Sequence, residues 1–183
     1  MNYKETLYFI AKCLTISLEV KNRQEIEKQL QSDTIDWDAV VKVSTSHYVF
    51  PAMYCNLKRV DFLQYLPQEL VSYMEYISDL NRDRNKKLVT EAKDLNSLLL
   101  ANNITPIFLK GTGNLLEGLY EDVGERMVGD IDFLFSEKDS FISSKIKARK
   151  VPSEKLLLAN NSFSSKPRRV ANPPKLYNSL KKT

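Results

Sequence analysis

The first hundred residues carry apolar side chains at the three- and four-residue intervals of amphipathic helices. In the first segment these positions are Leu7, Ile10, Ala11, Leu14 and Leu18. The pattern predicts four short helices, over residues 3–20, 22–30, 37–47 and 52–59. Asp36 stands just before the third of them, as expected of an N-cap. We therefore expect a helical N-terminal region.

One long helix is predicted after Pro67. Apolar positions recur at helical spacing for about 33 residues, until Asn102 and Asn103 end the pattern. Charged side chains crowd the middle of this helix, namely Arg82, Asp83, Arg84, Lys86 and Lys87. We expect this cluster to form a solvated face rather than a binding site.

Beyond Asn103 the pattern changes to short apolar runs that are typical of strands. Residues 104–109 and 130–135 are the two predicted strands, and Gly111 and Gly113 are predicted to turn the chain after the first. A short helix around residues 115–120 and a loop over 122–126 are expected between them. The minimum order is therefore helix, strand, turn, helix, strand.

Two carboxylates on the second predicted strand suggest the first chemistry. Asp130 and Asp132 are one residue apart, so on a strand they project from the same side, with Cα atoms roughly 6.5–7 Å apart. Such carboxylates repel each other unless a positive charge lies between them, and Mg²⁺ prefers oxygen ligands of this kind. A glycine turn that leads into a helix can bind phosphates through backbone N–H groups, to which Thr112 could add a hydroxyl donor. The pattern predicts a metal-and-phosphate site.

Composition excludes several other classes of protein. The chain has 43% hydrophobic and 27% charged residues, which is typical of a soluble globular protein. It has no apolar run near the ~20 residues of a membrane span, and its N-terminus lacks the features of a signal peptide. Cys13 and Cys55 are expected to be incidental buried thiols. His47 is the only histidine, so a histidine metal cluster or triad is excluded. We expect a cytoplasmic protein with no membrane partner.

The charge is distributed unevenly. Residues 1–136 hold 15 Lys and Arg against 20 Asp and Glu, whereas residues 137–183 hold 12 against 3, a net charge of +9. Asn, Ser and Pro are frequent in this basic tail, and we expect residues 141–183 to be poorly ordered. The tail lacks aromatic residues spaced to stack on bases, so nucleic acid is not an expected partner.

The motifs together resemble a known family. The residues that carry the likeness are Phe108-Leu109-Lys110-Gly111, Leu115, Tyr120, Arg126 and Gly129-Asp130-Ile131-Asp132-Phe133-Leu134. They are similar to the signature of the uncharacterised bacterial nucleotidyltransferase-like family, within the polymerase-beta-type superfamily. The resemblance covers roughly residues 1–136. It implies an α+β fold, with a helical region over 1–101 and, over 102–140, a partial nucleotidyltransferase core whose small mixed sheet is flanked by helices.

The resemblance also implies roles for individual residues. It assigns Gly111 and Thr112 to a turn at the triphosphate, and Asp130 and Asp132 to the first two ligands of two Mg²⁺ ions. Lys110 and Arg126 match basic positions of the family, where phosphate contact is expected. From the residues alone, Lys110 could equally be a surface residue, and Arg126 could pair with Asp130 or with Glu125.

Two details depart from the superfamily pattern. Thr112 stands where Gly or Ser usually follows the first glycine, and 19 positions separate Gly111 from Asp130, which is more than usual. A third carboxylate from a later strand is also expected, but the acidic residues after Asp132 are Glu137, Asp139 and Glu154, and none has a suitable strand pattern. We therefore expect a truncated or frame-shifted chain with an incomplete site.

The predicted reaction is Mg²⁺-dependent transfer of a nucleoside monophosphate from a nucleoside triphosphate to an acceptor that the residues do not identify. The alternative is a non-catalytic protein that binds a nucleotide or a partner, as an antitoxin or regulator would.

Overall fold

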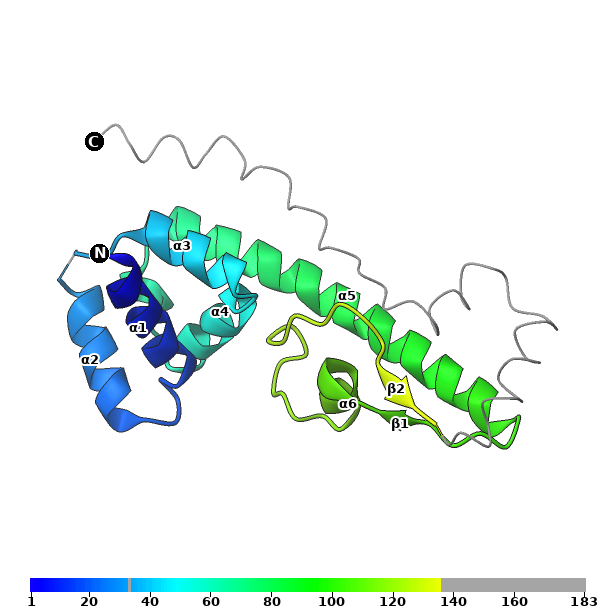
Figure 1. Cartoon of the computed structure of the whole chain (residues 1–183). Helices are drawn as coiled ribbons and strands as arrows, with labels where there is room; N and C mark the ends of the chain where they lie inside the picture. The colour runs from blue at the N-terminus through cyan, green and yellow to red at the C-terminus, as the bar shows by residue number, and fades with distance from the viewer. Residues whose placement is uncertain (33, 136–183) are drawn as a thin grey trace.

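The structure is a computed structural model that describes residues 1–32 and 34–135. Within these ranges the chain forms six α-helices, one short 3₁₀ helix and one two-stranded antiparallel sheet (Figure 1). The elements are α1 (Tyr3–Leu14), α2 (Val20–Leu30), α3 (Trp37–Ser46), α4 (Phe50–Arg59), η1 (Leu63–Tyr65), α5 (Gln68–Leu100), β1 (Ile107–Phe108), α6 (Lys110–Leu116) and β2 (Phe133–Leu134). The described part is therefore mostly helical.

Helices α1 to α4 and the N-terminal half of α5 enclose the main hydrophobic core. Its fully buried side chains include Phe9, Met53, Leu57 and Met74, which come from three different helices. The rings of Phe9 and Trp37 pack edge to face, with their centroids 6.1 Å apart. Burial of these large side chains is the main stabilising contribution to this region.

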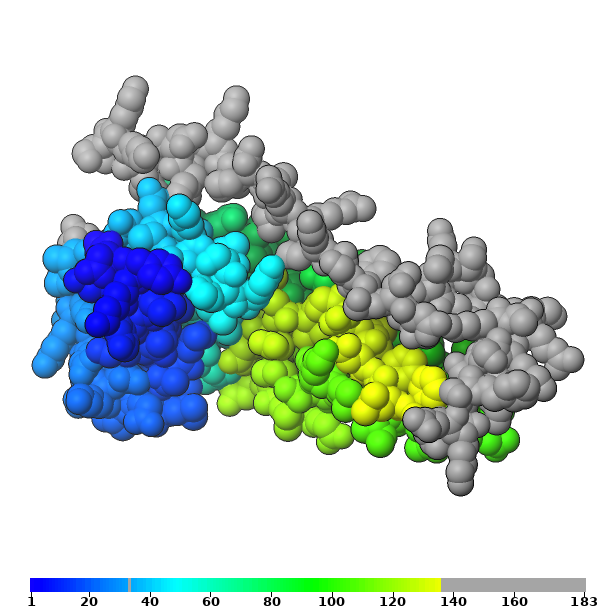
Figure 2. Space-filling model, in the orientation of Figure 1, coloured from blue at the N-terminus to red at the C-terminus, as the bar shows by residue number. Residues whose placement is uncertain are grey.

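The C-terminal half of α5 continues beyond this core and supports a second, smaller one. Leu88 of α5, Leu115 of α6 and Val128 form its centre, and Ile131 packs against them. Figure 1 shows α6 and the β1–β2 sheet alongside this half of α5, while α1 to α4 gather around the other half. The space-filling view shows the two parts in contact (Figure 2). One helix thus connects the helical region to the segment with the sequence motifs.

Over the first hundred residues the helix predictions are confirmed with one correction, whereas the short helix expected around residues 115–120 lies earlier, at Lys110–Leu116. The long helix has the predicted 33 residues, and the Asp36 side chain accepts a hydrogen bond from the N–H of Ala39 as an N-cap. The first helix, however, ends at Leu14 rather than at residue 20. The chain turns after Thr15, whose hydroxyl bonds back to the carbonyl of Ala11, and Leu18 is left 80% exposed. The turn carries Ile16 into the core, which local periodicity could not predict.

The strand predictions need larger corrections. Each strand is only two residues long, with Ile107 opposite Leu134 and Phe108 opposite Phe133. Gly111 and Gly113 lie inside α6 rather than in a turn before it, because α6 begins at Lys110. The predicted mixed sheet is not seen within residues 1–32 and 34–135, where the pairing is antiparallel. The predicted tail and its three acidic residues lie outside the described residues.

In the ranges described, no helix is both long and apolar enough to span a bilayer.

Candidate functional site

The start of α6 and the segment before β2 lie against each other. The backbone N–H of Leu109 donates to the carbonyl of Asp132 at 2.9 Å, which continues the pairing of β1 with β2. The Thr112 hydroxyl donates to the carbonyl of Asp130 at 2.7 Å, and Lys110 Nζ lies 3.1 Å from Asp132 Oδ2. The structure therefore brings together Lys110, Gly111, Thr112, Asp130 and Asp132, which we call the candidate site.

Thr112 has a structural role in this arrangement. Its side chain is 1% exposed, and its hydroxyl proton is used in the bond to the Asp130 carbonyl. The expected hydroxyl donor to a phosphate is therefore committed within the protein. Thr112 instead fixes the backbone of α6 to the backbone that carries the two carboxylates.

Both glycines of α6 are required by close packing. A Cβ atom on Gly111 would lie 2.9 Å from Val128 Cγ2, and one on Gly113 would lie 2.8 Å from the carbonyl oxygen of Phe108. The second contact is with backbone, which cannot move aside without disturbing β1. The glycines therefore allow α6 to approach both neighbouring segments of the candidate site.

Lys110 has an unusual backbone conformation. Its φ angle is +51°, in the left-handed region that costs an ordinary residue about 1–2 kcal/mol. Its side chain is 73% exposed, so the ion pair with Asp132 stabilises the fold by at most about 1 kcal/mol. The ion pair thus does not by itself explain why a lysine occupies this position.

The two carboxylates precede β2 and do not lie on it, which corrects the strand-based geometry. Both residues are half-buried. Asp132 is paired with Lys110, whereas the Asp130 carboxylate makes no hydrogen bond or ion pair with the described residues. Nor do these residues contain a group of three or more His, Cys, Asp or Glu that could hold a metal. The donor set suits an Mg²⁺ ion only if other oxygens complete its shell.

Arg126 enters this region through its backbone. Its carbonyl accepts hydrogen bonds from the side-chain amides of Asn81 at 3.1 Å and Asn85 at 2.6 Å. Its side chain is exposed and forms no ion pair in residues 1–32 and 34–135, so neither Asp130 nor Glu125 is its partner. The guanidinium is therefore open to solvent.

Side chains of α5 hold residues 121–126, which we call the anchored loop. The amide of Asn85 also donates to the carbonyl of Val123 at 2.6 Å, and that of Asn81 to the carbonyl of Gly124 at 2.6 Å. Both asparagines are at least nine-tenths buried. They supply the donors that these carbonyls lose on burial, and an unpaired buried carbonyl is costly.

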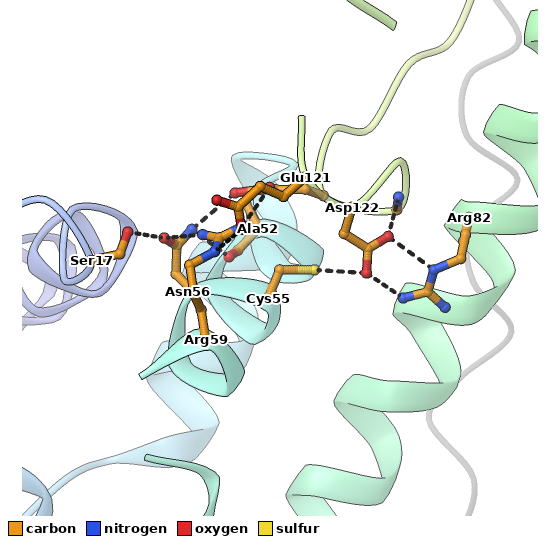
Figure 3. Close-up of polar contacts among 10 residues, drawn as sticks. Ser17, Ala52, Cys55, Asn56, Arg59, Arg82, Glu121 and Asp122 are labelled. Atoms are coloured by element: carbon orange, nitrogen blue, oxygen red, sulfur yellow. Dashed lines mark hydrogen bonds and ion pairs between the residues drawn. The ribbon is translucent and has the colours of Figure 1, made fainter. Parts of the chain in front are cut away.

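Arg82 completes this anchor by a two-pronged contact with Asp122. Its Nε and Nη2 atoms donate to the two carboxylate oxygens at 2.9 and 2.7 Å (Figure 3). Arg82 also pairs with Asp79 of the same helix. This is a correction to the sequence analysis, which placed Arg82 on a solvated face. Asp83, Lys86 and Lys87 are exposed as expected.

The Arg82 contact determines the charge state of Asp122. The hydrogen bonds from Arg82 lower the pKa of Asp122 to about 2, so it is ionised at neutral pH. The Cys55 thiol lies 3.8 Å from the same carboxylate. Burial, together with the charge of Asp122, raises the pKa of Cys55 to about 12. Cys55 is therefore a protonated structural thiol and not a nucleophile.

A second set of contacts joins α4 to the anchored loop. Arg59 donates to Glu121 at 2.6 Å and to Glu125 at 3.2 Å, and the amide of Asn56 donates to Glu125 at 3.1 Å (Figure 3). The side-chain Oδ1 of Asn56 accepts a hydrogen bond from the hydroxyl of Ser17, in the turn that follows α1. The helical region and the anchored loop are thus tied by polar contacts.

A surface groove of about 570 Å³ lies beside these contacts. It is lined by residues of α4, α5, α6 and the following segment, namely Lys58, Asp79, Arg82, Leu115, Gly118, Tyr120, Glu121, Asp122 and Val123. Leu115 and Tyr120 also pack in the small core with Val128 and Ile131. The groove therefore shares side chains with the small core, in which Val128 packs against Gly111 of the candidate site.

Comparison with known proteins gives one match. The family described as an uncharacterised nucleotidyltransferase matches residues 33–142, which is more than half of the chain. The chain belongs to this family. Neither a curated protein nor a solved structure matches the chain.

Membership in the uncharacterised nucleotidyltransferase family confirms the resemblance seen in the sequence. The match begins before α3 and includes the anchored loop and the whole candidate site, while α1 and α2 precede it. Sequence reasoning found the residues of the candidate site but missed Asn81 and Asn85. A usable signal was present, because these two polar residues continue the buried stripe that runs from Ile77 to Leu88.

We predict that replacing Asn85 with Asp destabilises this nucleotidyltransferase-family protein by about 3 kcal/mol or more. The change removes both amide hydrogens from the carbonyls of Val123 and Arg126 and buries a carboxylate beside them. Urea unfolding followed by circular dichroism measures the effect. The matched control is Asn96→Asp on the same helix, because Asn96 forms no side-chain hydrogen bond in the described residues. Equal stability of the two variants would contradict the claim that Asn85 holds the anchored loop.

We also predict a specific acid sensitivity. The pKa of Asp122 is lower in the folded protein, about 2, than its ordinary value of 3.8. The stabilisation is therefore complete above about pH 4 and is lost as the pH falls toward 2. In Arg82→Gln the free energy of unfolding should depend less steeply on pH in this window, whereas Lys87→Gln should retain the wild-type slope. Unfolding curves from pH 2 to 6 test this, and identical slopes for Arg82→Gln and wild type would refute the assignment.

Proposed function

We propose that the protein binds a nucleoside triphosphate together with Mg²⁺ and transfers its nucleoside monophosphate to an acceptor. Membership in the uncharacterised nucleotidyltransferase family supports this proposal. The observation that carries it is the contact between the start of α6 and the segment with the two carboxylates, made through Lys110–Asp132 and Thr112–Asp130. At this contact the Lys110 cation and the two carboxylates lie beside α6, which its two glycines allow to pack closely.

Each side chain of the candidate site then has a distinct task. Asp130 and Asp132 would hold Mg²⁺ through their carboxylate oxygens, and oxygens from outside the protein would have to complete its shell. Lys110 and the exposed Arg126 bind the negative charge of the triphosphate, since neither cation is buried in the fold. Gly111 lacks a side chain and so lets α6 pack close to Val128.

The proposed chemistry is substitution at the α-phosphorus. The oxygen of an acceptor hydroxyl forms a bond to this atom and loses its proton to solvent water. The bond from the α-phosphorus to the bridging oxygen of the β-phosphate breaks, and pyrophosphate leaves with that oxygen. When bound, Mg²⁺ supplies positive charge to the phosphate oxygens and to the leaving pyrophosphate. The residues of this chain contribute by positioning the triphosphate and by balancing its charge, which is how most of the rate enhancement in phosphate transfer arises.

A second candidate is a protein that binds the nucleotide without reaction. It is favoured by the number of carboxylates, because the described residues supply only Asp130 and Asp132 and no group of three potential ligands. Binding without turnover needs fewer ligands than two-metal catalysis. The antitoxin or regulatory role falls in this class.

We predict that the wild-type chain binds at least one of ATP, GTP, CTP and UTP in the presence of Mg²⁺, and that chelation of the metal abolishes binding. The variant Asp130→Asn with Asp132→Asn should lose at least tenfold in affinity, because two of the metal's charged ligands are gone. Isothermal titration calorimetry measures this affinity. Asp83→Asn, on the exposed face of α5, is the control that should bind as the wild type does.

Pyrophosphate release in the same mixtures separates the two candidates. Release that requires Asp130 and Asp132 supports the transferase, and binding without release supports the non-catalytic protein. If no triphosphate binds, or if the double variant binds as well as the wild type, both candidates fail.

A further inference from the structure

We propose that Lys110 is an internal counter-ion that competes with Mg²⁺ for Asp132, so that the metal enters together with the triphosphate rather than before it. This inference rests on the proposed function. It adds a role for Lys110 before the nucleotide arrives and an order in which the site is filled.

The first observation is the ion pair itself. Lys110 Nζ lies 3.1 Å from Asp132 Oδ2, so one of the two carboxylates in the candidate site already has a cation at contact distance. A metal ion that binds this oxygen must displace the ammonium group or accept a positive charge within a few ångströms. Either event weakens binding of the free metal.

The second observation is that the backbones on both sides are fixed while the lysine head group is free to move. Leu109 bonds to the carbonyl of Asp132, and Thr112 to that of Asp130, which locks the two segments in register. The Asp132 side chain is 29% exposed, but that of Lys110 is 73% exposed. The carboxylate therefore stays in place, whereas the lysine can exchange partners at low cost.

The third observation is the backbone conformation of Lys110. At a φ of +51°, glycine or asparagine would be the ordinary residue, and a lysine is strained. Strain of this kind persists only where the surrounding structure holds the backbone in place, and it is frequent at binding sites. The direction of the Lys110 side chain toward Asp132 is thus a feature of the strand-to-helix connection and not of a random surface lysine.

The order of filling follows from the ligand count. Asp130 and Asp132 alone leave most of the coordination shell of Mg²⁺ to water, and Asp132 is shared with Lys110. A triphosphate changes both conditions at once, because its oxygens complete the shell and offer the ammonium group a new anionic partner. Lys110 would then move from Asp132 to a phosphate and leave the Asp132 carboxylate available to hold the metal.

The test uses Mn²⁺, which prefers oxygen ligands, as a probe of the candidate site in the absence of nucleotide. Electron paramagnetic resonance measures the concentration of free Mn²⁺. Lys110→Gln should bind Mn²⁺ alone about fivefold more tightly than the wild type, because a competing charge is removed. The same variant should bind the Mg²⁺–triphosphate complex about tenfold more weakly, because the phosphate loses a charged partner. Opposite changes in the two affinities are the signature of a lysine that exchanges partners.

Two further variants separate charge from backbone strain. Lys110→Arg keeps the charge and should leave the Mn²⁺ affinity close to that of the wild type. Lys110→Gly removes the charge and also relieves the strained φ angle, and its Mn²⁺ affinity should match that of Lys110→Gln. In an Asp132→Asn background, Lys110→Gln should no longer tighten Mn²⁺ binding.

The failures are distinguishable. If the wild type binds the Mg²⁺–triphosphate complex but Lys110→Gln does not tighten binding of Mn²⁺ alone, the exchange is refuted and the proposed function stands. The same holds if Lys110→Gln strengthens or weakens both affinities together. If neither metal nor triphosphate binds to the wild type, the exchange and the proposed function fail together.

Discussion

The attachment of the anchored loop to α5 is the contact on which the rest of the candidate site depends. The side-chain amides of Asn81 and Asn85 donate four hydrogen bonds to carbonyls of the loop. Arg82 donates two further hydrogen bonds to the carboxylate of Asp122. These partners lie 38 to 45 residues apart in the chain. The loop leads directly to Val128, which packs against Gly111. The position of α5 therefore determines where the two carboxylates lie relative to α6.

The candidate site has little stability of its own. Its sheet has two residues per strand, and an isolated two-stranded sheet of this size would not persist in water. Its ion pair is exposed on the lysine side, so it adds little. The rigidity that a phosphate site needs must come from the 33-residue helix α5. The apolar face of its N-terminal half packs in the main core. The helical region that precedes the candidate site therefore holds it in place. The polar contacts of Arg59 and Asn56 connect the anchored loop to α4 as well.

Local signals in the sequence predicted the helices well and the site geometry in part. The long helix, its length and the Asp36 cap follow from periodicity and capping, which are short-range effects. The predicted end of the first helix was wrong because burial of Ile16 outweighs the local helix preference. The predicted strand lengths were wrong because the pairing joins residues up to 27 positions apart, which local preference does not determine. The motifs placed the glycine turn and the acidic pair in one site, but neither the Lys110–Asp132 ion pair nor the use of the Thr112 hydroxyl within the protein could be predicted from them. The anchor was missed because a polar residue on an apolar stripe shows no partner in the sequence.

Paramagnetic broadening of backbone amide signals by Mn²⁺, in the presence of a non-hydrolysable nucleoside triphosphate, tests the candidate site most directly. We predict that signals of residues 109–113 and 129–133 are broadened first, that those of α1 to α3 are spared, and that Asp130→Asn with Asp132→Asn abolishes the effect. Broadening centred on the groove at Lys58 and Tyr120, or the same broadening in the double variant, would contradict it.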